Sequence, residues 1–182
     1  GDLVVFAAGV RPNTAVAKAA GIEIGATGAI KVDALQRASS ESVFAVGDCS
    51  EAYHRISKKW VNLPLGDVAN KQGRVAGRVA AGLSAAFPGV VGSQAFKVFN
   101  LEAAATGLTE EEAASSGFKV AAVTLWGSPM AHSMSKGRKL GLKLVADSRT
   151  GKLLGAQAVG HGGAWARINM LSVCLWADLS ID

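Results

Sequence analysis

The sequence predicts an α/β segment followed by an α+β domain, in which helices flank an antiparallel sheet. Continuous apolar runs at residues 3–8 and 43–46 are typical of strands buried on both faces of a parallel sheet. Residues 85–92 contain Pro88 and two glycines and have the composition of a linker. Alternating segments joined by a hairpin loop follow. We therefore expect two domains, at residues 1–92 and 93–182.

The composition excludes several classes of protein. The chain has 182 residues, 49% of them hydrophobic and 18% charged, which argues against disorder. Its 19 Lys and Arg against 14 Asp and Glu give a net charge of +5. These basic residues are scattered, and no apolar run approaches the roughly 20 residues of a membrane helix. We expect neither nucleic acid nor a membrane as a partner. The densest basic cluster, typical of a solvated strand face, is Lys136, Arg138, Lys139 and Lys143.

Cysteine and histidine usage indicates neither a disulfide framework nor a metal site. Cys49 and Cys174 lie far apart and have no closely spaced partner, so a reduced, cytoplasmic location is expected. The three histidines are not spaced as metal ligands with either cysteine. The chain begins without Met, at an apolar run that needs neighbouring strands. It ends without a helix cap or polar tail. We therefore expect a piece of a longer protein, with the second domain truncated at its end.

In the first part, Asn13 or Thr14 can cap a short helix that runs to Ala20, and Gly21 ends it. Residues 22–24 and 30–32 predict a hairpin around the turn at 26–28, and residues 50–63 an irregular segment. Asp67 can cap a helix over about 68–83. The residues that recur at helical spacing and are expected on its buried stripe are Val68, Gln72, Val75, Val79 and Leu83.

In the second part, Thr109 and Glu112 form a capping box that opens a helix, and Gly117 ends it. A last helix over about 164–177 carries Ile168, Leu171 and Leu175 on one stripe. The loop at 147–151, with Gly at its end, indicates a hairpin. Strands are expected at 96–100, 119–126, 140–145 and 153–159. Together these elements predict the antiparallel α+β domain.

Gly47 and Asp48 follow the apolar run at 43–46 and are the first candidates for ligand binding. Glycine lets a ligand approach the backbone closely. The carboxyl ends of strands in α/β sheets are where ligands bind, and a carboxylate accepts hydrogen bonds from sugar-like hydroxyls. The ordinary alternative is a turn in which Asp48 only caps the next segment.

Two further segments are candidates for contact with a cofactor. The helix that starts after Leu65 offers free backbone N–H groups and a positive dipole end, which suit an electron-rich ring edge. The alternative is an amphipathic helix that only packs. Gly9 and Val10 follow the first apolar run, where an ordinary loop is equally compatible. Neither a Gly-x-Gly-x-x-Gly turn nor a phosphate-binding Gly-Lys-Ser loop is present, so the chain brings no phosphate cradle of its own.

The ordered set of these segments resembles a known family. DLVVFAAGVRPNT at residues 2–14, SVFAVGDC at 42–49 and the stretch from Leu63 to Arg74 resemble the FAD-dependent pyridine nucleotide-disulfide oxidoreductases. Within them the resemblance is greatest to the branch of NADH oxidases, NADH peroxidases and coenzyme A-disulfide reductases. Residues 97–109 and 151–157 resemble the start and the hairpin of that family's C-terminal dimerisation domain.

The resemblance implies a role for each candidate segment. The first strand would close the NAD(P)H domain, with the following loop near the nicotinamide, and Asp48 would bind the ribityl chain of FAD. The amides at the start of the helix would face the pyrimidine edge of the flavin. The expected cofactor-binding residues are Gly9, Val10, Gly47, Asp48, Leu65, Val68 and Ala69. No catalytic residue is expected within this chain, because the redox-active Cys of the family lies upstream.

The function implied by the resemblance is hydride transfer from NAD(P)H through FAD to a disulfide, a peroxide or oxygen. The chain would supply the C-terminal portion of such an enzyme, joined to upstream FAD- and NAD(P)-binding domains and assembled as a homodimer. The alternative is a non-enzymatic dimerisation module that is inactive without the upstream domains.

Overall fold

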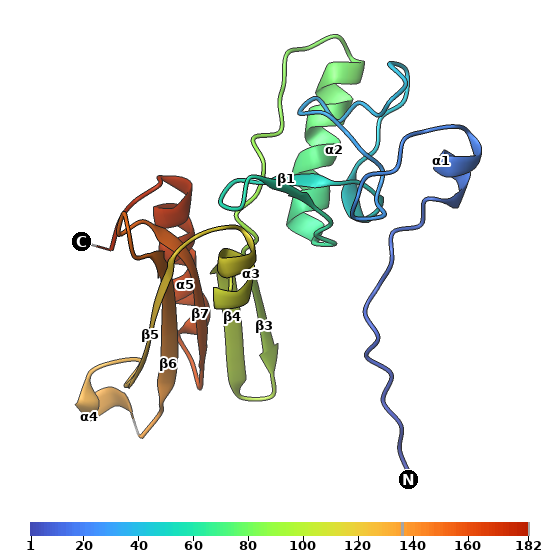
Figure 1. Cartoon of the computed structure of the whole chain (residues 1–182). Coiled ribbons are helices and arrows are strands. Elements are labelled where there is room, and N and C mark those ends of the chain that lie inside the picture. Colours follow the sequence, from blue (N-terminus) through green and yellow to red (C-terminus); the bar gives the residue numbers. More distant parts are fainter. Residues whose placement is uncertain (136, 182) are drawn as a thin grey trace. The chain divides into compact units, whose positions relative to one another are not determined.

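The computed structural model describes residues 1–135 and 137–181 (Figure 1). Lys136 of the basic cluster, Asp182 and the side chain of His132 lie outside the described part. The chain divides into two compact units. The first comprises Gly1–Ala52 and Trp60–Pro88, and the second comprises Tyr53–Lys59 and Gly89–Asp182.

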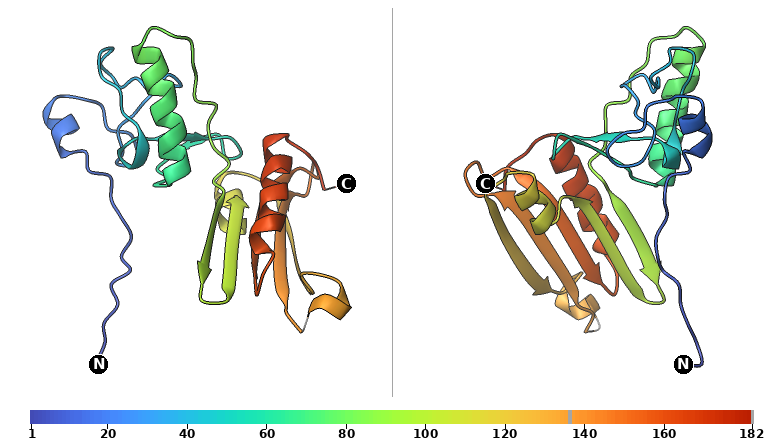
Figure 2. Two further views of the ribbon diagram at one scale, coloured as in Figure 1. Left: turned by 180° about the vertical axis from the view of Figure 1, so that it is seen from behind. Right: turned by 45° about the vertical axis from the view of Figure 1, so that its right-hand side comes forward.

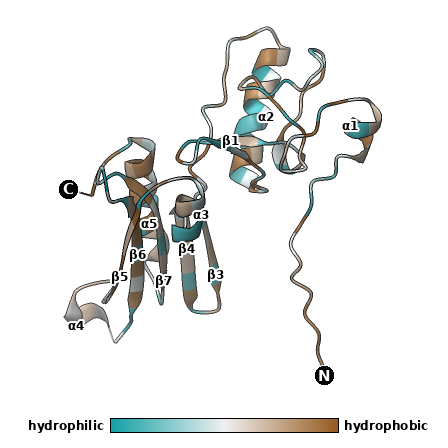
Figure 3. Ribbon diagram, viewed as in Figure 1, coloured by the Kyte–Doolittle hydropathy of each residue, from teal (hydrophilic) through white to brown (hydrophobic). Residues whose placement is uncertain are grey.

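The prediction of a buried strand at residues 3–8 is wrong for this structure. The segment forms neither helix nor strand, and the side chains of Leu3 and Phe6 are 83% and 91% exposed. Figure 3 shows this N-terminal stretch as hydrophobic along most of its length. A strand becomes buried on both faces only when neighbours flank it, and no strand of the described residues pairs with this one.

The next elements of the first unit follow the sequence more closely. Helix α1 spans Ala15–Ala19, and Gly21 follows it in the left-handed conformation, at φ +76°, as predicted. The expected hairpin is reduced to one antiparallel bridge between Ile24 and Ile30. Thr14 precedes α1 without a side-chain capping bond. The small core around these segments consists of Ile30, Val32 and Ala45, with partly buried apolar side chains around them.

The prediction of a second buried parallel strand, at residues 43–46, is also wrong. Phe44 forms a single antiparallel bridge with Arg37, and only Ala45 of the four is buried. The apolar run thus pairs with one loop instead of lying between two strands. It leads directly into the short 3₁₀ helix η1, Gly47–Cys49.

Residues 50–63, expected to be irregular, contain a two-stranded antiparallel hairpin. Strand β1 spans Ala52–His54 and β2 spans Lys59–Val61. Lys58 closes the turn in the left-handed conformation, at φ +57°. The turn holds neither Gly nor Asn, the residues that commonly mark this conformation, so the hairpin signal is weak in the sequence.

Helix α2 spans Gly66–Ala80 and confirms the predicted helix with a different cap and a narrower buried face. Leu65, not Asp67, is the N-cap residue, and no side chain caps the helix. The buried residues, spaced four apart, are Val68, Gln72 and Ala76. Leu83 lies beyond the helix and is 53% exposed.

The second unit contains the predicted antiparallel sheet (Figure 2). All its neighbouring strands are antiparallel, in the order β3-β4-β7-β6-β5. The sequence did not predict β4, because its Ala-rich segment has one β-branched residue, Thr106, and no aromatic residue. The strands are β3 Gln94–Val98, β4 Leu101–Gly107, β5 Val120–Gly127, β6 Leu140–Asp147 and β7 Leu153–Gly160.

Helices flank this sheet as predicted. Helix α5, Ala164–Trp176, covers one face, with Ile168 and Leu175 buried. Helix α3, Glu110–Ser115, packs at one end of the other face and has both bonds of the predicted capping box. A short helix α4, His132–Ser135, follows β5. The core under α5 consists of Ala104, Leu140, Ala156, Ala158, Ala164 and Ile168.

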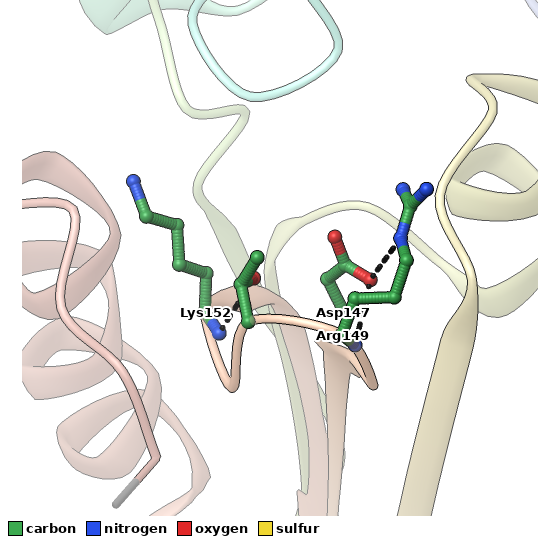
Figure 4. A network of polar contacts seen from close by, with 4 residues as sticks. Asp147, Arg149 and Lys152 are labelled. Carbon is green, nitrogen blue, oxygen red and sulfur yellow. Dashed lines mark hydrogen bonds and ion pairs between the residues drawn. The ribbon is translucent and has the colours of Figure 1, made fainter.

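The loop between β6 and β7 is held by its own polar groups (Figure 4). One Asp147 carboxylate oxygen accepts from the Arg149 backbone N–H at 3.1 Å and from its Nε at 3.3 Å. These bonds hold the pKa of the Asp147 carboxyl below its usual value. Lys152 forms an ion pair with Asp178. The hairpin predicted at 147–151 is therefore stabilised by local bonds between Asp147 and Arg149, and the ion pair ties its end to the segment after α5.

His54, at the end of β1, is a buried titratable group of the second unit. Its Nδ1 accepts from the backbone N–H of Ser57 at 3.2 Å, which leaves the proton of the neutral ring on Nε2. Burial lowers the pKa of His54, while the charge of Glu112 and a hydrogen bond to the Val91 backbone oppose the shift in part. The folded unit therefore favours neutral His54.

We expect this histidine to make the second unit less stable in acid. Because its pKa is lower when folded, its contribution is fully present above the unfolded value of 6.5 and is lost as pH falls through the folded pKa. Urea unfolding midpoints measured from about pH 8 to about pH 5 should fall less for His54→Gln than for the unsubstituted chain. His161→Gln, at an exposed position, is the control. Equal slopes in all three proteins would contradict the prediction.

Candidate functional site

The turn at Gly47–Ser50 lies directly against the first turns of α2. Gly47 has φ +74°, and a Cβ at this position would lie 3.3 Å from Cβ of Ala69. Both the left-handed backbone and the close approach favour glycine here. The structure thus brings together two of the segments that the sequence singled out independently.

The Gln72 side chain joins this turn to α2. It is fully buried, and its Oε1 accepts from the Gly47 backbone N–H at 2.8 Å and from Ser50 Oγ at 3.3 Å. Its Nε2 donates to the Glu51 carbonyl oxygen at 3.1 Å. Hydrogen bonds in a buried environment are electrostatically strong, and the loss of one partner leaves a costly unsatisfied group. Gln72 therefore fixes the turn relative to the helix.

Asn62 holds the same turn from another direction. It follows β2, and its Nδ2 donates to the Asp48 carbonyl oxygen at 2.9 Å and to the Ser50 carbonyl oxygen at 3.3 Å. The backbone of the turn is thus bonded by two carboxamide side chains. The Asp48 residue itself remains exposed, so its carboxylate faces solvent or a ligand.

The start of α2 supplies backbone donors close to this turn. The Ala69 N–H donates to the Leu65 carbonyl oxygen at 3.0 Å, the first bond of the helix. The amides of Gly66, Asp67 and Val68 precede it and have no acceptor four residues back within the helix. Of the two amides predicted to face a ligand, that of Ala69 is already bonded within the helix, whereas that of Val68 has no acceptor four residues back within it.

The structure does not bring Gly9 and Val10 to this site. They lie in the exposed segment before α1, and Val10 is 73% exposed. Gly9 has φ +73°, and among the described residues nothing lies within 4 Å of a Cβ built there. Their predicted role near a nicotinamide stays a prediction.

Two residues of this site are not predicted by the sequence. Gln72 is expected on the buried stripe of the helix, but as a packing residue, and Asn62 has no expected role. The available signal was an amide side chain at a core position of an amphipathic helix, because a buried amide requires partners. Nothing local to Asn62 indicates which carbonyl groups it meets.

Other kinds of site find little support. Among the residues that the structure describes, no three His, Cys, Asp or Glu side chains are grouped to hold a metal ion. Cys49 and Cys174 are both free thiols. In the described ranges, no helix has the length and apolar character needed to cross a membrane.

The arrangement has a defined chemical capacity. An exposed carboxylate can accept hydrogen bonds from ligand hydroxyls, and unpaired amides at the positive end of α2 can donate to an electron-rich ring edge. The fixed turn holds both kinds of group on one rigid frame. The site is suited to holding and polarising a ligand, and it contains no nucleophile paired with a base.

Comparison with family models gives two matches. The model described as pyridine nucleotide-disulphide oxidoreductase, dimerisation domain, matches residues 93–182. The model described as pyridine nucleotide-disulphide oxidoreductase matches residues 1–73. Together these matches include the candidate site and the whole of the antiparallel sheet.

Individual proteins agree with these matches. The chain is 43% identical over 159 residues to an NAD(P)H sulfur oxidoreductase (CoA-dependent) of Pyrococcus furiosus, covering 87% of this chain and 36% of that protein. It is 33% identical over 181 residues to an NADH oxidase of Methanocaldococcus jannaschii, covering 100% of this chain and 40% of that protein. A solved FAD-dependent pyridine nucleotide-disulphide oxidoreductase from Desulfovibrio vulgaris is 39% identical, with a TM-score of 0.83, over 98% of this chain and 43% of that one.

The contact between Gly47 and α2 can be tested by a pair of substitutions. Gly47→Ala adds a Cβ against Ala69 to a backbone that already disfavours L-residues, whereas Gly28→Ala has the same left-handed conformation and open space. The backbone cost is about 1–2 kcal/mol in each. We expect hydrogen exchange of the 66–80 peptide to be faster in Gly47→Ala than in Gly28→Ala. Equal exchange would show that the contact contributes nothing.

Proposed function

The chain belongs to the pyridine nucleotide-disulphide oxidoreductase family, and on that basis we propose that it works as the C-terminal portion of an FAD-dependent NAD(P)H oxidoreductase. It spans 36% and 40% of the length of the two curated relatives described above. The activity of the whole enzyme would move hydride from NAD(P)H through FAD to a disulfide, a peroxide or oxygen. The two relatives are a sulfur oxidoreductase and an NADH oxidase, which supports a sulfur compound or oxygen as the acceptor.

The residues at the candidate site fit the chemistry of a flavin. Asp48 would accept hydrogen bonds from the ribityl hydroxyls, and the Val68 amide at the positive end of α2 would face the pyrimidine edge. Gly47 leaves space beside Ala69 that a Cβ would fill. Bound FAD would supply the hydride and electron transfer, and this chain's residues would hold it and favour negative charge on the ring. Gly9 and Val10 would contact the nicotinamide, and Leu65 would set where α2 begins.

One observation carries this proposal: the Gly47–Asp48 turn is bonded through buried Gln72 to the helix whose first three amides have no acceptor four residues back within the helix. A turn whose aspartate merely caps the next segment would not require a buried link to a second element. The geometry thus favours ligand binding over the ordinary alternative. Upstream domains of the same polypeptide would supply the phosphate cradles that these 182 residues lack.

We expect the protein expressed from the whole reading frame that contains this chain to purify with visible flavin absorbance and to oxidise NAD(P)H. Asp48→Ala should weaken FAD binding by about 10- to 100-fold, as expected for loss of hydrogen bonds to a charged group. Glu41→Ala, which removes an exposed carboxylate elsewhere in the same unit, is the control. A protein that neither contains nor takes up flavin would contradict the proposal. The 182 residues alone should not oxidise NAD(P)H.

We also propose that the second unit forms a homodimer. Helix α5 leaves large apolar side chains exposed, including Trp165, Met170 and Val173. Exposed apolar surface of this kind marks protein–protein contact, and residues 93–182 match a dimerisation domain. Isolated from the upstream domains, the chain would then act as a dimerisation module without activity, which is the alternative function.

Sedimentation of the 182-residue chain tests the dimer. At roughly tens of micromolar we expect a dimer, and Val173→Asp should weaken it by about tenfold or more, because a charge would replace an apolar contact. Leu3→Asp places the same charge at an exposed apolar position outside the second unit and should leave the dimer intact. A monomeric unsubstituted chain would refute the homodimer.

Two further points complete the proposal. A cytoplasmic location is supported by the free thiols of Cys49 and Cys174, since disulfides are rare in reducing compartments. The boundary between the cofactor-contacting region and the dimerisation domain would lie at residues 92 and 93.

A further inference from the structure

We propose that Gln72 and Asn62 are positioning residues that set where the Asp48 carboxylate lies relative to the start of α2. The inference rests on the proposed function, because it concerns the placement of two groups that would contact the flavin. Neither side chain needs to touch the cofactor. Each acts through the backbone of the Gly47–Glu51 segment, and together they hold that backbone from two different elements.

Both polar atoms of the Gln72 side chain have partners within the segment that the side chain holds. Its carbonyl oxygen accepts hydrogen bonds from the Gly47 N–H and the Ser50 hydroxyl, and its amide nitrogen donates one to the Glu51 carbonyl oxygen. A hydrophobic side chain of similar length would fill the same space and leave three polar groups without this partner. At a fully buried position each loss is costly, so the turn would shift to find other partners.

Asn62 completes the restraint on the other side of the carboxylate. Its bond to the Asp48 carbonyl oxygen, at 2.9 Å, acts on the residue itself, whereas Gln72 holds the preceding amide. The backbone on both sides of the Asp48 Cα is therefore fixed while its side chain stays exposed. That combination is expected of a ligand-binding carboxylate, because pre-organisation reduces the ordering cost of binding.

The position of Gln72 on α2 gives the restraint its functional meaning. Gln72 lies four residues after Val68, on the same helix face, and the Val68 amide belongs to the first turn of that helix, where it has no intrahelical acceptor. Helix α2 thus carries both the Val68 backbone N–H, the proposed donor to the ring edge, and the Gln72 side chain, which positions Asp48. A misplaced turn would separate two groups that must contact one ligand together.

The matched control is Gln36, another buried glutamine of the first unit. Its Nε2 donates to the Asp33 carbonyl at 3.4 Å, and its side chain makes no bond to the 47–51 segment among the described contacts. Gln36→Met and Gln72→Met remove the same chemical group from the interior of one unit. Gln36 has one long hydrogen bond and an Oε1 atom without a partner, whereas Gln72 has three hydrogen bonds, so the two variants are compared after each is corrected for its own loss of unfolding free energy.

The experiment has two arms. In the 182-residue chain, exchange of the Gly47 amide should be at least about tenfold faster in Gln72→Met than in Gln36→Met, because its acceptor is lost. In the flavin-containing protein that carries this chain, Gln72→Met and Asn62→Leu should each weaken FAD binding by about tenfold and shift the flavin absorption spectrum, while Gln36→Met changes neither. The double variant should lose less FAD-binding free energy than the sum of the losses in the two single variants, because both residues act on one turn.

The outcomes separate the two proposals. Unchanged Gly47 exchange in Gln72→Met would overturn the inference, whatever the flavin result. So would unchanged FAD affinity in Gln72→Met and Asn62→Leu, or an equal loss in Gln36→Met. Absence of flavin from the unsubstituted protein would overturn the proposed function, and the exchange arm would still show whether Gln72 holds the turn.

Discussion

The candidate site depends on one buried carboxamide. Gln72 links α2 to the Gly47–Glu51 segment through three hydrogen bonds. Apolar burial cannot by itself hold a turn in one position, since the hydrophobic effect is non-directional. Directional bonds from a side chain that is itself fixed on a helix can do so. The first unit therefore uses polar contacts for precision where the second uses apolar packing.

The second unit is ordered by close approach between its central strands and α5. The buried small residues Ala104, Ala156 and Ala158 bring β4 and β7 near the helix. Where these strands meet, a Cβ at Gly107 would lie 2.3 Å from the Leu154 carbonyl oxygen. Such tight contacts leave no space for larger side chains, so this region requires glycine and alanine at these positions.

This division matches the proposed roles of the two units. A cofactor that performs the chemistry requires the protein to hold it, orient it and adjust its electrostatics. Groups of that kind are the exposed carboxylate of Asp48 and the first amides of α2. Gln72 and Asn62 would hold them in position. In the proposed homodimer, the exposed apolar side chains of α5 would serve a different purpose, since they would offer surface to another polypeptide. Neither unit needs a nucleophile for these tasks.

The sequence alone determined the elements that depend on local interactions. The capping box of α3, the glycine after α1, the 147–151 loop and the stripe of α5 each arise from residues within a few positions of one another. It also identified Gly47, Asp48 and the start of α2 as candidates. Only the tertiary structure decided what the apolar runs at 3–8 and 43–46 pair with, that an Ala-rich segment is the strand β4, and that Gln72 and Asn62 hold the turn. Burial and buried hydrogen bonds require partners distant in sequence, and no local pattern names them.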